Sequence, residues 1–516
     1  MFNACTYLVD RHVESGDGDR TAVTGPGGTL TYAELLQRVR RMASGLRDLG
    51  VRPEERVMIY MADSPDMLAL ILGAMRIGAV PVPVSTMMTP KDLAGVLHDS
   101  RARVLVAGAE LAPAAEEAAR SAPDLVAFLL TGETPPQAPA WAQSHLLAKI
   151  AESDGLGDPY PTSPDSTALW LYTSGTTGLP KGAVHRHASI RSVTETYGAQ
   201  VLGIRPDDRC LSVPKLFFAY GIGNSCFFPL SVGASAVLEP ARPTPAGIAQ
   251  RLAAERPTLF FAVPTFYAAL LSSDLPDDTF ASVRQAVSAG EPLPAPIFRR
   301  FAERFGVEIL DGIGATEALH IFVSNRPGEV VPGTTGVPVP GYDVRIVDDS
   351  GADVAAGTPG HLMVRGDSIA TGYWCRTDVT RKVFQGQWLR TGDTYVADES
   401  GHLRFLGRSD DMIKAAGIWV SPSEVEARLL EHPDVAQAVV VAVPDGDGLD
   451  KPVAGIVRTE GSAVTEGEII AFCREGLAGF KRPRAVFFLQ GLPTTATGKI
   501  QRYVLRDALR DSGFTP

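Results

Sequence analysis

Short apolar runs with strand character alternate with helical patterns over residues 56–290, and this alternation leaves few folds open. "RVMIYM" is followed by the helical "DMLALILGAMRI" and then by "AVPVPV". The same order returns where "LFFAV" precedes "PTFYAALLSS" and "QAVSAG" precedes "APIFRRFAERFG". Repeated strand–helix–strand units predict parallel sheets covered by helices. Ligand sites in such folds lie at the carboxyl ends of the strands.

The pattern changes after about residue 332 to short alternating strands with turn signals, such as "YDVRIVDDSG" and "YVADESGHLRFLG". A chain of 516 residues is also too long for one core. We expect an α/β protein with a large N-terminal domain of stacked α/β subdomains over 1–407. This domain includes a small β-barrel-like subdomain at about 332–407. A hinge at 408–411 and a small, mobile α+β C-terminal domain over 412–516 should follow.

Charge and cysteine usage exclude several classes of partner. The formal net charge of −11 offers no basic footprint for nucleic acid or for an anionic membrane. The apolar run after residue 66 is interrupted by Arg76, Pro81 and Pro83, which is wrong for a membrane span, and the start shows no secretory pattern. The five cysteines are scattered without a C-x-x-C pair. We therefore expect a cytoplasmic protein that handles small molecules.

The stretch "YTSGTTGLPKG", residues 172–182, combines glycines, hydroxyl side chains and one lysine after an apolar run. Backbone N–H groups and hydroxyls of such a loop can surround phosphate oxygens while the lysine neutralises charge. A P-loop NTPase is excluded because Gly175 and Gly178 are three apart and Lys181 is followed by Gly182.

This stretch closely resembles the phosphate loop of the adenylate-forming superfamily, which includes acyl-CoA synthetases, peptide-synthetase adenylation domains and luciferases. Six further matches follow in family order: "SAGEPLP" (288–294), "GIGATE" (312–317), "TGD" (391–393), "GRSDDMIKAAG" (407–417), "PSEVE" (422–426) and "PTTATGKIQR" (493–502). The resemblance implies that ATP and Mg²⁺ convert a carboxylate to an acyl-AMP anhydride with loss of pyrophosphate. A thiol then displaces AMP.

The resemblance also assigns roles to individual residues at the nucleotide. The β- and γ-phosphates would be held by Thr173, Ser174, Gly175, Thr176, Thr177, Gly178 and Lys181. Thr316 would contact the α-phosphate, and Glu317 would bind Mg²⁺. Asp393 and Arg408 would hold the ribose hydroxyls, although such a pair on its own is more often a surface ion pair. The adenine slot would be lined by Gly290, Glu291, Pro292, Asp311 and Gly312, without the aromatic residue that many relatives place before "G-x-T-E".

Lys499 carries the central prediction of the C-terminal domain. By resemblance it bridges the substrate carboxylate and the α-phosphate, where a point charge stabilises the transition state. The small domain would then rotate about Asp410 before the thiol enters. Lys414 and Gly417 would line the pantetheine tunnel after this rotation.

The residues predicted to hold the acid resemble the benzoate-CoA ligase branch. Ala219 stands where amino-acid adenylation domains carry an aspartate, which disfavours an α-amino acid. The aryl pocket would comprise Phe218, Ala219, Tyr220, Gly221, Ala289, Gly314, His320 and Ile321. Ring side chains would close this pocket to long chains and leave a flat apolar slot for benzoate or a close aryl acid. Phe217 and Phe218 as plain core and His320 as a satisfied structural histidine are the alternatives.

Two acceptors stay open for the second step: coenzyme A and the phosphopantetheine arm of an acyl carrier protein. "FKRPR" (480–484) matches the segment with which aryl-CoA ligases hold the nucleotide of CoA, so Phe480 and Arg482 would flank its adenine; a basic surface turn is the alternative. A non-catalytic nucleotide-binding protein or an ATP hydrolase would not explain why four predicted site residues occur together: Lys499, Glu317, Asp393 and Arg408.

Overall fold

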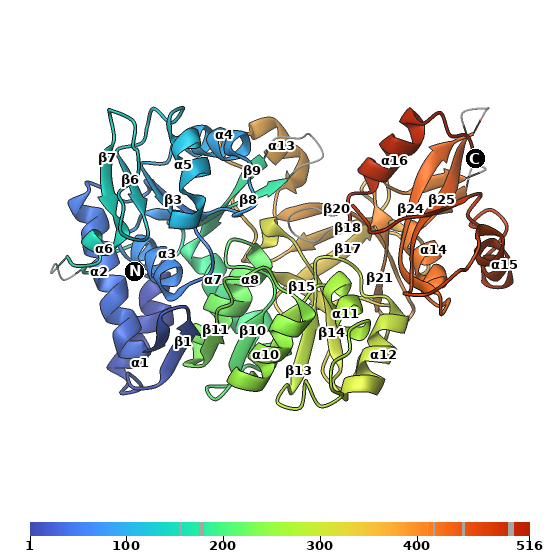
Figure 1. Ribbon diagram of the computed structural model, residues 1–516, viewed down its shortest axis with the longest axis horizontal. Helices are drawn as coiled ribbons and strands as arrows, with labels where there is room; N and C mark the ends of the chain where they lie inside the picture. The colour runs from blue at the N-terminus through green and yellow to red at the C-terminus, as the bar shows by residue number, and fades with distance from the viewer. Residues whose placement is uncertain (154–156, 175–179, 410, 416–417, 446–448, 494–499) are drawn as a thin grey trace.

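The computed structural model describes residues 1–516 except 154–156, 175–179, 410, 416–417, 446–448 and 494–499. A large part, which extends to about Arg408, lies beside a smaller part formed by the rest of the chain (Figure 1). Strands and helices alternate through the large part, so the predicted α/β fold is confirmed. Among the described residues, no helix is long and apolar enough to cross a membrane.

The first sheet has five strands, and every neighbouring pair in it is parallel. Its spatial order is β4 (Val80–Pro83), β3 (Arg56–Tyr60), β5 (Val104–Ala107), β6 (Ala127–Leu130) and β7 (Gln143–Leu146). The intervening helices are α3 (Pro65–Arg76), α4 (Pro90–Ser100) and α5 (Ala112–Ala119). Strands β3 to β6 are almost wholly buried, as expected for a parallel sheet that is covered on both faces.

The second sheet has nine strands and carries most of the predicted site. Its order is β16 (Val337–Pro338), β15 (Ile321–Ser324), β14 (Ile309–Gly314), β13 (Gln285–Ser288), β12 (Leu259–Ala262), β10 (Arg209–Ser212), β11 (Ser235–Val237), β1 (Thr21–Gly25) and β2 (Gly28–Thr31). The strands from β14 to β1 are parallel, whereas both edges are antiparallel. Its main helices are α2 (Tyr32–Asp48), α10 (Pro245–Glu255), α11 (Pro264–Leu271) and α12 (Ala295–Phe305).

Several helices start from the same short sequence signal, a hydroxyl residue followed by proline. The hydroxyl oxygen accepts a backbone N–H three residues later, and the proline occupies the first helical position, where it lacks only a donor that the helix does not use. These pairs are Ser64-Pro65, Thr89-Pro90, Thr244-Pro245 and Ser421-Pro422. Helix α2 instead begins with a capping box, in which Thr31 and Glu34 satisfy each other's backbone donors.

The first ten residues are anchored to α3 by a buried ion pair. Asp10 ends a short π-helical stretch, η1 (Thr6–Asp10), and both of its carboxylate oxygens lie 2.8 Å from Nη1 of Arg76. The two side chains are only 7% and 2% exposed. Asn3 adds hydrogen bonds to the carbonyls of Met75 and Arg76. The N-terminal segment is therefore part of the core.

Antiparallel structure completes the large part. The hairpin of β8 (Thr167–Ser174) and β9 (Pro180–Arg186) packs beside β4. A five-stranded antiparallel sheet follows near the end of the large part. It consists of β17 (Asp343–Val347), β18 (Gly360–Arg365), β19 (Phe384–Gln385), β20 (Trp388–Ala397) and β21 (Leu403–Arg408), with α13 (Thr377–Val383) before β19.

The smaller part combines a β-hairpin with a three-stranded sheet and three helices. The hairpin is β22 (Ile413–Ala415) with β23 (Ile418–Val420), and the sheet is β24 (Val435–Pro444), β25 (Asp450–Arg458) and β26 (Val486–Phe488). The helices are α14 (Pro422–Leu429), α15 (Glu466–Gly476) and α16 (Arg502–Asp511). Two apolar clusters, one on each face of β24 and β25, form its core.

Candidate active site

The described residues of the phosphate-loop motif lie on β8 and β9, at the paired ends of the two strands. Thr173 pairs with Lys181 across the two strands, so two of the residues predicted to hold the β- and γ-phosphates lie opposite each other. Gly175, Thr176, Thr177 and Gly178 themselves lie outside the described residues.

Tyr172, the first residue of the motif, anchors the hairpin to helix α4. Its hydroxyl donates to Oδ2 of Asp99 over 2.6 Å. Its ring lies against Gly182, where an added Cβ would come within 3.2 Å of Cζ of the tyrosine. Burial, together with this hydrogen bond, raises the pKa of Tyr172, so the phenol stays protonated. No role was predicted for Tyr172 or for Asp99.

Glu317 and Lys181 both contact Tyr373, an aromatic residue that was not predicted to belong to the site. Glu317 lies in the short turn η5 (Thr316–Ala318), and its Oε1 accepts a hydrogen bond from the hydroxyl of Tyr373 over 2.5 Å. The ammonium of Lys181 lies 5.5 Å from the centroid of the same ring. Mg²⁺ is typically held by one or two carboxylates plus substrate phosphates, so a single acid beside the phosphate loop suits that ion.

The backbone at Thr316 is fixed by a buried histidine. Nε2 of His185 donates to the carbonyl of Thr316 over 2.8 Å. Burial lowers the pKa of His185 to about 4, so the ring is neutral at physiological pH and Nε2 carries the proton that this bond requires.

Asp393 and Arg408 face each other across β20 and β21. Oδ1 of Asp393 lies 2.8 Å from Nη1 of Arg408, and the carboxylate raises the pKa of the guanidinium. Asp393 is buried, while the Arg408 side chain is about half exposed. The two predicted ribose ligands are thus together and form the ion pair that was the alternative interpretation; their contact with ribose remains a prediction.

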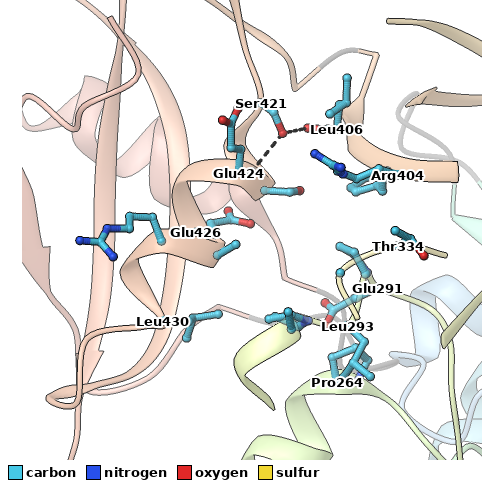
Figure 2. A pocket seen from close by; sticks show the side chains of 18 of the residues that line it. Pro264, Glu291, Leu293, Thr334, Arg404, Leu406, Ser421, Glu424, Glu426 and Leu430 are labelled. Carbon is cyan, nitrogen blue, oxygen red and sulfur yellow. Dashed lines mark hydrogen bonds between the residues drawn. The ribbon is translucent and has the colours of Figure 1, made fainter. Parts of the chain in front are cut away.

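A cavity of about 950 Å³ lies between the large and small parts, and Glu291, Pro292 and Asp311 of the predicted adenine slot help to line it. Figure 2 shows Glu291 on one side and Glu426 on the other. Oδ1 of Asp311 has no hydrogen-bond partner among the described residues, and burial raises the pKa of this carboxyl well above its usual range. An unpaired buried polar group suits adenine, whose edge carries both donors and acceptors.

Two residues of the slot are glycines for different reasons: one has a backbone conformation that other residues rarely adopt, and the other has no room for a side chain. Gly290 has a φ of 97°, which favours glycine. At Gly312 an added Cβ would lie 2.9 Å from Cγ2 of Ile321, so the strand passes close to its neighbour.

Residues 500 and 502, which follow Lys499, line the cavity from the small part. The backbone N–H of Ile500 donates to Oε1 of Glu291 over 2.9 Å. Arg502 then binds both carboxylate oxygens of Glu426 at 2.9 and 2.8 Å, and Oε1 of Glu426 also accepts the N–H of Val440. Lys499 lies outside the described residues, but its neighbour Ile500 reaches the adenine slot.

The predicted aryl pocket gathers around His320. Its Nε2 donates to the carbonyl of Tyr220 and to Oδ1 of Asn224, at 3.3 and 3.2 Å. The hydroxyl of Tyr220 donates to the carbonyl of Val287 at the end of β13, over 3.0 Å. The ring of Phe228 packs edge-on against His320 with 4.5 Å between centroids. Burial lowers the pKa of His320 to about 3, so the enclosed ring is neutral.

Glycines allow this close packing. They lie in α8 (Ala219–Ile222), in the π-helical stretch η4 (Gly223–Phe227) and at the end of β14. An added Cβ would lie 1.9 Å from the carbonyl oxygen of Lys215 at Gly221, 2.3 Å from Cδ2 of His320 at Gly223 and 2.7 Å from the carbonyl oxygen of His320 at Gly314. Gly223, Asn224 and Phe228 were not among the predicted pocket residues.

The remaining pocket residues belong to one apolar cluster. Ala289 and Ile321 are buried in it, and Phe218, Ala219 and Tyr220 pack against it half-buried. Phe217 is buried in the same cluster, which agrees with its alternative interpretation as core. Phe218 meets Phe217 edge-on at 4.5 Å and stays partly open.

Phe480 and Arg482 lie in the turn after α15. Arg482 donates to the carbonyls of Leu477 and Arg474, which satisfies acceptors at the C-terminal end of that helix. Phe480 packs half-buried against the core of the small part. These contacts match the surface-turn alternative, and a clamp on CoA remains a prediction. Asp410 and Gly417 lie outside the described residues; Lys414 belongs to β22, where it pairs with Trp419.

Comparison with known proteins places this site in a family. Residues 9–374 match the family described as "AMP-binding enzyme", and residues 424–499 match "AMP-binding enzyme C-terminal domain". The chain is 43% identical over 513 residues to the benzoate–CoA ligase of Thauera aromatica, covering 98% of this chain and 96% of that protein.

Two crystal structures resemble the chain over nearly its whole length. The benzoate CoA ligase from Burkholderia xenovorans LB400 is 42% identical with a TM-score of 0.91, and the match covers 98% of this chain and 100% of that one. The anthranilate CoA ligase AuaEII, in complex with anthranoyl-AMP, is 37% identical with a TM-score of 0.94, covering 99% and 98% of the two chains.

Proposed function

Because this chain belongs to the AMP-binding enzyme family and is an AMP-forming acid–thiol ligase, we propose that it activates benzoate or a close aromatic carboxylic acid and transfers the acyl group to coenzyme A. The observation that carries the proposal is the enclosed, neutral ring cluster around His320, three residues along the chain from Glu317. An acid whose ring lay in this cluster would present its carboxylate near Thr316 and Glu317. The names of the relatives support the same class of acid and CoA as the acceptor.

In the first step the substrate carboxylate attacks the α-phosphorus of ATP. A bond forms between the carboxylate oxygen and phosphorus, the bond to the β-phosphate oxygen breaks, and pyrophosphate leaves. Mg²⁺, bound at Glu317, would supply positive charge at the triphosphate. Lys181 would neutralise the leaving pyrophosphate, and Lys499 would steady the charge that develops at the α-phosphate. Asp393 and Arg408 would orient the ribose.

In the second step the thiol of CoA loses its proton to solvent, its sulfur attacks the acyl carbon, and AMP leaves with the electron pair of the anhydride bond. The chain needs no nucleophile of its own for either step. Of its five cysteines, Cys5, Cys210, Cys226 and Cys473 are buried, and burial raises their thiol pKa values. Their part in the enzyme is therefore packing.

Selectivity for an aryl acid would follow from the rings and the lack of charge in the predicted pocket. Ala219, at the start of α8, offers no carboxylate to an α-ammonium group, and the neutral His320 adds no charge. Rings from Tyr197, Tyr220 and Phe228 surround His320 at centroid distances of 5.4, 5.5 and 4.5 Å. We expect these rings to favour a flat aryl group over a flexible chain, which has to order many bonds on binding.

A panel of carboxylic acids with ATP tests the proposal. Benzoate and its relatives should release pyrophosphate and AMP, and CoA should then yield the aryl thioester by mass spectrometry. A pantetheinylated carrier protein in place of CoA should give little product. The variant Lys499→Ala should abolish benzoate-dependent pyrophosphate exchange and spare thioester formation from supplied benzoyl-AMP. Turnover of a medium-chain fatty acid as fast as benzoate, or ADP as product, would contradict the proposal.

A further inference from the structure

We propose that Tyr373 is a positioning residue that couples the metal-binding acid Glu317 to the phosphate-loop lysine Lys181. The inference rests on the proposed function, because both partners act there on the triphosphate of ATP. Tyr373 touches each of them, although it lies 56 positions from Glu317 in the chain.

The hydroxyl of Tyr373 fixes the carboxylate of Glu317. An O–H···O⁻ contact of 2.5 Å is at the short end for a charge-assisted hydrogen bond, and such bonds are the strong ones. The bond uses Oε1, and no hydrogen bond from another described side chain or backbone group reaches Oε2 of Glu317. One carboxylate oxygen is therefore oriented by the protein while the other remains for the metal ion. A second partner of this kind orients a metal ligand and tunes its affinity.

The ring of Tyr373 contacts the ammonium group of Lys181. The ammonium of Lys181, 5.5 Å from the ring centroid, is within the range in which a cation is attracted to an aromatic ring. The ring cannot swing away, because Phe384 packs edge-on against it at 5.3 Å and Ala183 and Ala370 complete a small apolar cluster. Tyr373 is only 9% exposed. A fixed ring therefore gives the lysine a preferred position.

The backbone ties the same segment to the returning strand of the phosphate hairpin. Tyr373 forms a bridge with Ala183, and the N–H of Trp374 donates to the carbonyl of Gly182 over 2.9 Å. Gly372 makes this approach possible, with a φ of 147° and a hypothetical Cβ only 2.8 Å from Cγ2 of Thr380. The hydroxyl of Thr380 in turn accepts the N–H of Tyr373. The hairpin, the ring and the acid are thus joined by direct contacts.

This arrangement predicts a selective defect when only the hydroxyl is removed. Tyr373→Phe keeps the ring under Lys181 but frees the carboxylate of Glu317. Loss of such a partner typically weakens metal affinity by about 10- to 100-fold. Binding of AMP, which carries no β- or γ-phosphate, should change little. Tyr373→Leu removes the ring as well and should weaken binding of the triphosphate further.

The test compares Tyr373→Phe with Tyr32→Phe. Tyr32 is a buried tyrosine in α2 whose hydroxyl donates to the carbonyl of Ala234 over 2.7 Å, so this control loses one buried hydroxyl elsewhere. Calorimetry measures the affinity for AMP and for α,β-methylene-ATP with and without Mg²⁺. We expect Tyr373→Phe to lose about tenfold or more in affinity for the Mg²⁺-bound analogue only, and pyrophosphate exchange to need correspondingly more Mg²⁺.

The inference is overturned if Tyr373→Phe and Tyr32→Phe bind the Mg²⁺-bound analogue alike, or if Tyr373→Phe weakens AMP equally. Tyr373→Leu provides a second test. If the ring positions Lys181, Tyr373→Leu should bind the metal-free analogue more weakly than Tyr373→Phe does. Failure of the wild-type protein to activate any aryl acid would count against the proposed function alone, because the nucleotide-binding comparison needs no acid.

Discussion

The ion pair between Arg502 and Glu426 should control both the stability of the small part and the first half-reaction. Arg502 begins α16, three residues after Lys499, and donates hydrogen bonds to both carboxylate oxygens of Glu426. Arg502→Ala removes this contact, three residues after Lys499 in the chain. Glu426→Ala does the same and also leaves the N–H of Val440, 2.8 Å from Oε1, without its acceptor.

The magnitude follows from burial. The side chains of Arg502 and Glu426 are 20% and 10% exposed, which places the pair between a surface ion pair, worth about 0–1 kcal/mol, and a buried pair, whose breakage costs about 3–5 kcal/mol. We expect Arg502→Ala to cost about 2 kcal/mol. Glu426→Ala should cost about 1–3 kcal/mol more, because it orphans a buried donor. Arg506→Ala, in the same helix, loses only an exposed contact with Asp507 and is the matched control.

Hydrogen exchange measured by mass spectrometry on peptides from β24 and α16 reads the small part separately from the large one. Half-reaction assays supply the functional readout: if about 1.4 kcal/mol of restraint on residues 500–502, which follow Lys499, is lost, adenylation slows about tenfold. Thioester formation from supplied acyl-AMP should be spared. Equal loss of protection in Arg502→Ala and Glu426→Ala, an equal effect of Arg506→Ala, or equal slowing of both half-reactions would refute the reasoning.

Two further predictions concern the core of the large part. Asp10→Leu or Arg76→Met alone should cost about 3–5 kcal/mol in urea unfolding, since each leaves a buried charge, whereas the double variant should be more stable than either; additive losses would contradict this. His187 is buried, and its Nδ1 accepts the N–H of Ala4 over 3.0 Å. Burial lowers the pKa of His187 to about 4, below its unfolded value of about 6.5, so the unfolded chain binds more protons between these values. The stability this group contributes is complete above pH 6.5 and falls by about 3 kcal/mol toward pH 4. His187→Asn should therefore show a shallower dependence of melting temperature on pH across that window, and an unchanged slope would argue against a neutral His187.

The α/β fold was predictable because local patterns encode it. Each β-α-β unit shows its own hydrophobic periodicity. A hydroxyl residue followed by proline marks the start of four of the helices. The family motifs are local as well, so the residues in the "GIGATE" and "TGD" strings could be assigned by number. The π-helical stretch at Gly223 to Phe227 was not predictable, since it continues the apolar pattern of an ordinary helix.

Other site residues were missed because their roles depend on partners that are distant in the sequence. Tyr373 gains its role from Glu317 and Lys181, and Tyr172 from Asp99. Neither pairing has a sequence spacing that could reveal it. A glycine directly before Tyr373, in "TGYW", was the one local signal, because Gly372 marks a close approach of the backbone. For Arg482, the local pattern does not reveal that its guanidinium caps α15.

The anchoring of residues 1–10 bears on how the protein can be produced. Met1 is 99% exposed, so an affinity tag fused ahead of it would extend into water without displacing a packed side chain. A start site chosen after residue 10 would instead leave the guanidinium of Arg76 without Asp10 in the interior of the protein. It would also expose the last turn of α3, which Asn3 covers. We expect such a chain to aggregate during expression.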